Sequence, residues 1–291
     1  MLCTQCPRRC GAQRLPDVPA GVCAMPETAV VARAALHFWE EPPISGVRGS
    51  GTVFFSGCNL RCVFCQNSSI SQKGIGKSVS VERLREIFHG LIDQGAHNIN
   101  LVTPTHFAHI LLQALDEPLT VPVVWNTGGY ESVETLRKLE GKVQVYLPDL
   151  KYLDSERARR YSAAPDYPKM ATAAIREMFR QTGPCVFDDG GILQRGVIIR
   201  HLLLPGGVSE AKAVMDWVAS EFPRGSVYFS LMSKYVPLGR AGEYHEINRR
   251  LRKSEVKAAQ EYMAALDLPG YTQDGAAASE EYVPEFDLTG V

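Results

Sequence analysis

The chain has 291 residues, of which 45% are hydrophobic and 22% are charged, and its formal net charge is -1. A chain of this size and composition can bury one large core plus a small appendage, and its near-neutral charge gives no electrostatic basis for a nucleic-acid or anionic-membrane partner. The start of the chain lacks the apolar stretch of a secretory signal, and no apolar run approaches the roughly 18 residues of a membrane helix. We therefore expect a cytoplasmic protein whose partners include neither nucleic acid nor membrane.

The first part of the chain is rich in cysteine. Four cysteines fall within it, namely Cys3, Cys6, Cys10 and Cys23. Four thiolates close a metal site, so this group predicts either a structural zinc or a second, fully ligated iron–sulfur cluster, and the sequence does not decide between them. In a reducing compartment such cysteines argue for metal ligation before disulfides. We expect residues 1–48 to form a small N-terminal metal-binding segment and residues 49–291 to form the main domain.

A short strand predicted over residues 51–57 runs into the string GCNLRCVFCQN, which holds Cys58, Cys62 and Cys65. Its CxxxCxxC spacing lets one loop offer three thiolates to a 4Fe-4S cluster; such clusters normally take four cysteines, so one iron stays open to a substrate. The alternative is that these cysteines form part of a zinc site. The ligands of zinc sites, however, usually pair a CxxC with a second CxxC or an HxxxH, and no fourth ligand lies nearby in the sequence. An oxygen-labile cluster with an open iron suggests anaerobic use. We expect the remaining cysteine, Cys185, to be a core or strand residue.

Beyond this loop, strand and helix patterns alternate. Further strands are predicted over 98–102, 121–125, 143–147, 196–204 and 227–232, with helices over 81–92, 107–114, 133–139, 155–182, around 214–218 and over 254–268. Short apolar strands buried on both faces favour a parallel sheet, and right-handed crossovers curl such a sheet into a (β/α)6 partial TIM barrel. The tail from Gly270 is rich in Ala, Glu and Gly, and we expect it to be loosely packed over the barrel mouth.

Polar residues follow the predicted strands, at the sheet edge where parallel α/β folds bind ligands. The candidates are Thr103, Thr105 and His106 after the second strand, Asn126 after the third, and Asp149 and Lys151 after the fourth. Arg200 lies inside the long apolar strand over 196–204, where a buried charge needs a partner.

The cysteine motif is the signature of the radical S-adenosylmethionine (SAM) superfamily, which this chain resembles over roughly residues 49–268. The resemblance implies a partial barrel, a 4Fe-4S cluster whose open iron binds SAM, and reductive cleavage of SAM to methionine and a 5′-deoxyadenosyl radical that abstracts hydrogen. It implies that Phe64 packs on the adenine, and Asn67 follows the motif as it does in the family. It also implies an electron donor of the flavodoxin or ferredoxin type.

Two further segments, PDLK (148–151) and IRHLLLPG (199–206), resemble the activating enzymes of glycyl radical enzymes such as pyruvate formate-lyase. This resemblance implies that Asp149 and Lys151 contact SAM and that Arg200 lies by the ribose or supports that wall. The substrate it implies is a backbone glycine of a partner glycyl radical enzyme.

The sequence departs from that branch at the end of the second strand, where TPTH replaces a GGEP-like segment. Thr103 and Thr105 could supply hydroxyl and carbonyl acceptors for the SAM ammonium group but bring no carboxylate, and His106 could contact SAM or make a structural hydrogen bond. With the early cysteines, these features resemble less characterised paralogues that carry an N-terminal four-Cys motif. Two alternatives stay open: modification of a peptide or small metabolite, and a non-catalytic iron–sulfur electron-transfer protein.

Overall fold

A computed structural model of the chain describes residues 2–272 and 284–291. Within these residues one sheet has the strand order β10-β9-β8-β6-β5-β4-β2-β1-β3, and β7 pairs with β8 off this path. The strands are β1 (Ala29–His37), β2 (Ser50–Phe55), β3 (Lys77–Val79), β4 (Ile99–Val102), β5 (Val123–Thr127), β6 (Val145–Pro148), β7 (Val186–Phe187), β8 (Leu193–Leu202), β9 (Tyr228–Met232) and β10 (Gly270–Thr272).

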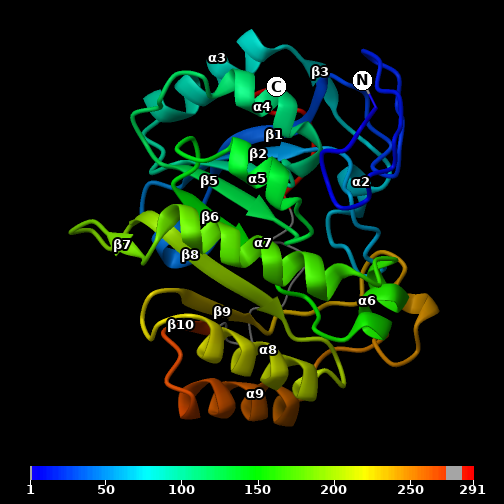
Figure 1. The fold of residues 1–291 in the computed structure, drawn as a ribbon, viewed down its shortest axis with the longest axis vertical. Coiled ribbons are helices and arrows are strands. Elements are labelled where there is room, and N and C mark those ends of the chain that lie inside the picture. Colours follow the sequence, from blue (N-terminus) through cyan, green and yellow to red (C-terminus); the bar gives the residue numbers. More distant parts are fainter. Residues whose placement is uncertain (1, 273–283) are drawn as a thin grey trace.

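Helices follow most of the parallel strands and cover the outside of the curved sheet (Figure 1). They are α1 (Pro42–Ser45), α2 (Ser68–Ser71), α3 (Val81–Asp93), α4 (Ala108–Ala114), α5 (Val133–Lys138), α6 (Ser155–Ser162), α7 (Tyr167–Thr182), α8 (Val208–Glu221) and α9 (Lys253–Ala265), with 3-10 turns at η1 (Thr105–Phe107) and η2 (Ala241–Glu243). No helix in the described parts of the chain is both long enough and apolar enough to cross a membrane.

The expected α/β fold with a mostly parallel sheet is confirmed. The six predicted strands appear as β2, β4, β5, β6, β8 and β9, and within this set each strand is parallel to the next. Their carboxyl ends meet at one end of the molecule, where the arrowheads of β5 and β8 point toward α6 and the N-terminal segment (Figure 1). This arrangement is consistent with the predicted partial barrel.

The sequence did not predict β1, which pairs antiparallel with β2 and β3 at one edge of the sheet. It was missed because it precedes the alternating strand–helix pattern from which the other strands were predicted. The sheet therefore extends into residues 29–37, which our division at residue 48 had assigned to the N-terminal segment. The four cysteines of the expected N-terminal segment all lie before Ala29.

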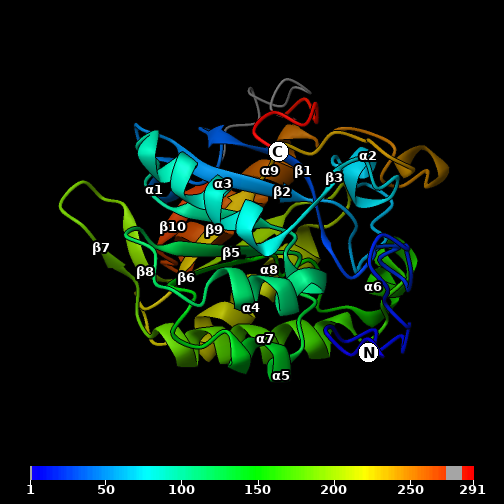
Figure 2. The same ribbon diagram turned by 90° about the horizontal axis from the view of Figure 1, so that it is seen from above.

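Two further expectations differ from the structure. The helical stretch predicted over 155–182 is two helices, because Ala163 takes a left-handed conformation (φ 50°) at the end of α6 and Pro168 starts α7. The tail is not loosely packed where it is described: β10 pairs with β9, and residues 284–291 lie along β1 (Figure 2). Residues 273–283, on which the rest of that expectation falls, lie outside the described residues.

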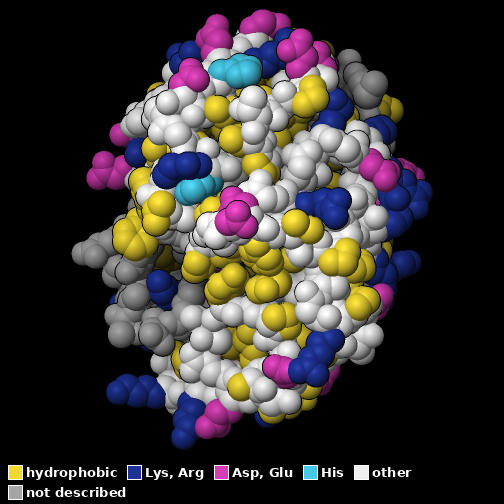
Figure 3. All heavy atoms as spheres, turned by 90° about the vertical axis from the view of Figure 1, so that its left-hand side faces the viewer, with side chains coloured by type: hydrophobic (Ala, Val, Ile, Leu, Met, Phe, Trp, Pro, Cys, Tyr) yellow, Lys and Arg dark blue, Asp and Glu magenta, His cyan; other side chains and the backbone are white. Residues whose placement is uncertain are grey.

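The other end of the barrel is closed by α1. Ile44 of this short helix is fully buried among Val124, Val145 and Ile198, side chains that point into the barrel from its strands. Hydrophobic side chains also gather across the middle of the outer surface at this end (Figure 3). Ligands of the barrel interior are therefore expected at the carboxyl ends of the strands.

Candidate active site

The loop between β2 and α2 carries Cys58, Cys62 and Cys65 as free thiols. The Leu60 N–H donates to Cys58 Sγ at 3.4 Å, and the Asn67 N–H likewise lies against Cys65 Sγ. Hydrogen bonds to sulfur stabilise a thiolate, and in iron–sulfur proteins they tune the cluster.

The three thiols are largely shielded from water: Cys62 is buried, and Cys58 and Cys65 are half-buried. Burial, and then the neighbouring Cys62, raise the pKa values of Cys58 and Cys65 above the ordinary value. Over residues 2–272 and 284–291, no group of three or more His, Cys, Asp or Glu side chains could hold a metal ion in its present arrangement. The fit to an iron–sulfur cluster therefore rests on the donor chemistry: three free, mutually close thiols on one loop.

The loop is held from several sides. Arg8 of the N-terminal segment donates from Nε to the Asn59 carbonyl at 2.8 Å and from Nη1 to the Ala163 carbonyl at 2.5 Å. On the other side, a Cβ added at Gly239 would lie 2.8 Å from the Val63 carbonyl oxygen and 3.3 Å from that of Cys65. Only glycine lets the chain after β9 approach the loop this closely.

Lys151 lies between the cysteine loop and the strand ends. Its Nζ is 2.5 Å from Asp149 Oδ2, and both side chains are nearly buried. Burial alone would lower the pKa of Lys151, but Asp149 and then Cys62 raise it above its ordinary value. The structure thus places a fixed positive charge beside the thiols, next to the loop that follows β6.

Arg200 of β8 forms one network inside the barrel with two other sequence candidates, Asp149 and Asn126. Its Nε donates to Asp149 Oδ1 at 2.9 Å, and its Nη2 donates to Asn126 Oδ1 at 2.7 Å. Burial would lower its pKa, but Asp149, Glu41 and Glu40 raise it, so the guanidinium stays charged. The partner that a buried arginine needs is therefore present.

Two members of this network, Glu40 and Glu41, were not predicted from the sequence. Glu40 Oε2 accepts from Arg200 at 3.1 Å, its Oε1 accepts from Asn126 Nδ2 at 3.0 Å, and Glu41 Oε2 lies 3.9 Å from the guanidinium. Burial raises the pKa of both glutamates. Two adjacent acids just before a Pro-Pro pair were the available signal, but nothing local in the sequence shows that they enter the barrel.

The TPTH segment has a carboxylate partner after all. Thr105 Oγ1 donates to Glu131 Oε1 at 2.5 Å, and Thr127 Oγ1 also donates to that oxygen. Glu131 Oε2 is buried without a hydrogen-bond partner in the described parts of the chain. Burial raises the pKa of Glu131 to about 7, against the lowering effect of these hydroxyls. The Gly-Gly-Tyr-Glu string after the third predicted strand was the signal, since it places an acid directly behind a buried strand end.

The remaining candidates have mainly structural contacts. His106 Nε2 lies 2.7 Å from the Ser56 carbonyl, and burial lowers its pKa to about 3, so it stays neutral. Asn67 precedes α2, and Phe64 is buried with its ring edge-on to Tyr235 at 6.2 Å. Thr103 has a left-handed backbone (φ 58°), and its N–H donates to the Asn126 carbonyl. Of the predicted residues, the structure brings Asn126, Asp149, Lys151 and Arg200 together.

The four N-terminal cysteines share a structural pattern with the cysteine loop. The backbone N–H two residues after the cysteine lies against the sulfur of Cys6, Cys10 and Cys23, as it does for Cys58 and Cys65. Cys3 interacts electrostatically with each of the other three thiols. Arg14 also donates to Cys23 Sγ at 2.8 Å and to the His106 carbonyl at 2.5 Å. This segment therefore packs against both the cysteine loop and the TPTH turn.

Cys185 lies apart from both groups. Its Sγ is 3.4 Å from the Val197 carbonyl beside β8, and it packs against the cluster around Ile44. It occupies the strand-side position that the sequence predicted.

The chain matches known proteins in sequence. The model of the radical SAM superfamily matches residues 52–192. An uncharacterized protein of Methanocaldococcus jannaschii is 30% identical over 272 residues, which cover 89% of this chain and 73% of that protein.

Solved structures show the same fold at low sequence identity. SuiB of Streptococcus suis bound to S-adenosylmethionine is 14% identical with a TM-score of 0.52, over 75% of this chain and 48% of SuiB, so the chain spans about half of that protein. A spore photoproduct lyase is 12% identical with a TM-score of 0.51, over 75% of this chain and 74% of the lyase. At these identities the likeness concerns the fold alone.

Proposed function

Because this chain belongs to the radical SAM superfamily, we propose that it binds a 4Fe-4S cluster and SAM at this site and abstracts hydrogen from a glycine of a partner protein. The observation that carries the proposal is the set of three free thiols of Cys58, Cys62 and Cys65 on one loop, with Lys151 beside them. When bound and reduced, the cluster supplies the electron that cleaves SAM to methionine and a 5′-deoxyadenosyl radical.

The chain's own residues have three tasks in this chemistry. The backbone N–H groups of Leu60 and Asn67 lie against two of the sulfurs and favour their thiolate forms when the cluster is bound. Lys151, kept protonated by Asp149, offsets the negative charge of the site and can donate to a carboxylate such as that of SAM. The Thr103–Thr105 turn, held by Glu131, presents backbone carbonyls to an ammonium group.

The glycine substrate is supported by the DLK and IRxxxxPG resemblances, whose Asp149, Lys151 and Arg200 form one connected network. We also propose a flavodoxin- or ferredoxin-type donor, since the chain must receive a low-potential electron. A second candidate function is modification of a peptide or small metabolite. The observation that favours it is the TPTH turn, whose Thr105 hydroxyl is already bonded to Glu131.

For the N-terminal cysteines we propose a structural zinc or a second iron–sulfur cluster. The observation that supports metal-held thiolates is the closeness of Cys3 to Cys6, Cys10 and Cys23, each of which also has a backbone group nearby that lowers its thiol pKa. Metal analysis of the Cys6→Ser variant tests this: the variant should lose either one zinc or the iron and sulfide of a second cluster. Unchanged metal content would refute the site.

The central test is anaerobic. The protein is reconstituted with iron and sulfide, reduced and given SAM, and 5′-deoxyadenosine is quantified beside the Cys58→Ala/Cys62→Ala/Cys65→Ala variant. Cys185→Ala is the matched control, because it removes a thiol that lies outside the site. Deoxyadenosine from the wild type and the control alone supports the proposal. None from a cluster-loaded wild type would identify a non-catalytic electron-transfer protein instead.

The substrate is tested separately. Incubation with a candidate glycyl radical protein should give a glycyl radical signal in its electron paramagnetic resonance spectrum. Deoxyadenosine that rises with a peptide or small metabolite, without a glycyl radical in any protein, would favour the second candidate function.

A further inference from the structure

The free edge of β1 is already occupied by an extended stretch of polypeptide. β3 pairs with β1 only over Ala29–Val31. Beyond it, the Leu288 N–H donates to the Ala32 carbonyl at 3.1 Å, and the Ala34 N–H donates to the Thr289 carbonyl at 2.8 Å. The C-terminal segment 284–291 thus adds itself to the sheet edge, which is the way in which many domains bind extended peptides.

An aromatic side chain anchors this segment on the inner face of the sheet. Phe286 packs edge-on against Phe54 with ring centroids 5.5 Å apart, in a small cluster that includes Ile70 and Val102. Phe54 and Val102 alternate with the residues under the outer helices, so they face into the barrel. Ile70 belongs to α2, directly after the cysteine loop, so the anchor lies next to the proposed active site.

Two further contacts define the shape and charge of the bound segment. Arg33 of β1 donates to the Glu285 carbonyl at 2.9 Å and to Asp287 at 2.8 Å. A Cβ added at Gly290 would lie 2.1 Å from the Ala34 carbonyl oxygen, so the chain can pass there only without a side chain. The edge therefore recognises an aromatic residue, an acid next to it and a glycine four residues after the aromatic.

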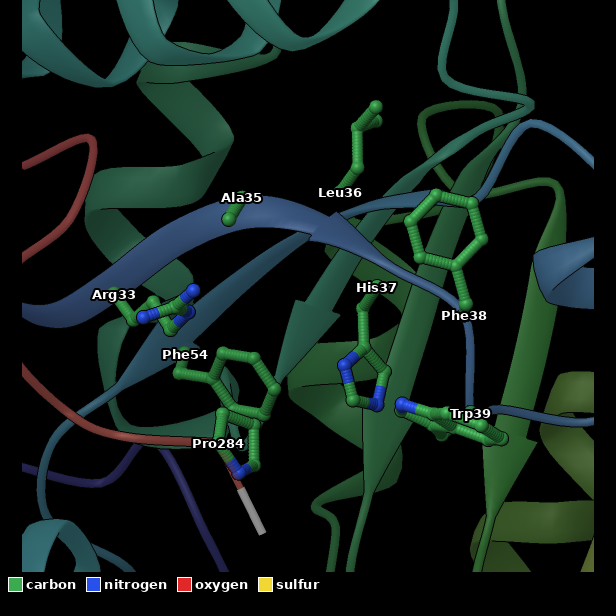
Figure 4. A pocket seen from close by; sticks show the side chains of 8 residues that line it. All are labelled: Arg33, Ala35, Leu36, His37, Phe38, Trp39, Phe54 and Pro284. Atoms are coloured by element: carbon green, nitrogen blue, oxygen red, sulfur yellow. The ribbon is translucent and has the colours of Figure 1, made fainter. Parts of the chain in front are cut away.

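A cavity of about 190 Å³ lies beside Pro284 and is lined by Arg33, His37, Trp39 and Phe54 (Figure 4). Trp39 is 62% exposed. Aromatic side chains therefore line the cavity next to the segment.

The segment is held in a way that permits exchange. Asp287 is 49% exposed, so its ion pair with Arg33 is screened by water and salt. Leu288 is 41% exposed, and Phe286 is only partly buried. A competing polypeptide needs to replace only a few solvent-exposed contacts.

We propose that the edge of β1 is a binding groove for an extended polypeptide with an aromatic anchor, and that the C-terminal segment 284–291 occupies it as an internal competitor. This inference rests on the proposed function in that it takes the partner to be a polypeptide. The partner must displace the segment to reach the open edge of the barrel. The tethered segment lowers the apparent affinity of the partner until it is displaced.

The test uses a fluorescein-labelled octapeptide PEFDLTGV, identical to residues 284–291, and fluorescence anisotropy with the full chain under anaerobic conditions. The Phe286→Ala/Leu288→Pro variant, which loses the anchor and one main-chain donor, should bind it about tenfold or more tighter than the wild type does. An unlabelled octapeptide with alanine in place of the phenylalanine should compete poorly. Glu285→Ala is the matched control, since it keeps the carbonyl that Arg33 uses, and it should behave as the wild type does.

Equal affinity of the wild type and the variant, or no binding to the variant, would overturn the proposal. Thermal melting confirms that the variant is folded, and if it is not, the single Phe286→Ala variant must show the same tightening or the proposal fails. Binding is measured without SAM or reductant, so it is independent of catalysis. Peptide binding without deoxyadenosine would refute the proposed function alone, and deoxyadenosine without peptide binding would refute the groove alone.

Discussion

Replacing Arg200 with methionine should strongly destabilise the protein. Methionine keeps much of the volume but leaves the carboxylates of Asp149 and Glu40 buried without their cation; all three side chains are only 13% exposed. Removing one partner of a buried ion pair costs about 3–5 kcal/mol. With an unfolding entropy of about 2.1 cal/mol/K per residue, this predicts a melting temperature about 5 to 8 °C lower.

The matched control is Arg159→Met, because Arg159 and Glu156 form an ion pair on α6 with both side chains mostly exposed. We expect that change to leave the melting temperature almost unchanged, because water screens an exposed ion pair. Both variants are melted without cluster between pH 5 and 8. Equal melting temperatures of the two variants at pH 7 would refute the role of the buried network.

The pH dependence gives a second check on the same variant. Burial raises the pKa of Asp149, but Arg200 and then Lys151 lower it overall, so in the wild type its ionised form stabilises the fold above the unfolded value of 3.8. Without Arg200 the buried carboxylates take up protons more readily. The difference in melting temperature between the wild type and Arg200→Met should therefore become smaller as the pH falls. A difference that became larger would contradict this account.

Three other changes probe single positions, each by melting of the cluster-free protein. Gly129→Ala should cost about 1–3 kcal/mol more than Gly141→Ala, because only at Gly129 would the new Cβ overlap a backbone oxygen, that of Asp149, although both glycines have φ near 80°. The free energy of unfolding of the wild type should fall by about 1.4 kcal/mol per pH unit as the pH falls from 6.5 toward about 3, because His106 stays neutral in the fold but takes up a proton when unfolded. His106→Gln should remove this pH dependence. Burial gives Glu131 a pKa of about 7, above its unfolded value of 4.5, so its contribution to the stability of the fold is lost as the pH rises through that window. The melting temperature of Glu131→Gln should therefore rise relative to that of the wild type between pH 5 and 8. A difference between the two melting temperatures that does not change with pH would contradict this pKa.

Local patterns predicted the repeating part of this molecule well. Apolar runs located β2, β4, β5, β6, β8 and β9, and the cysteine spacing pointed to the family that the sequence matches now show. The need of Arg200 for a partner was also predictable, because a charge in an apolar strand cannot stay unpaired.

Contacts between distant segments were not predictable in the same way. Nothing near Glu40 in sequence shows that it meets Arg200, which is 160 residues away. The carboxylate that joins Thr105 comes from Glu131, in the loop of the neighbouring strand. An analysis of one strand end at a time therefore misses side chains of one loop that contact side chains of another. The strand β1 was missed for a similar reason, because the strands with which it pairs lie elsewhere in the sequence.

The closure of the barrel by α1 has a kinetic consequence for the proposed chemistry. In the described parts of the chain, the fully buried Ile44 fills the far end of the barrel axis. Incoming SAM and the outgoing nucleoside and amino acid must share one route, and a polypeptide on the edge of β1 lies beside it. Turnover should therefore be ordered, with the products leaving before the next SAM enters, and accumulated 5′-deoxyadenosine should inhibit in competition with SAM.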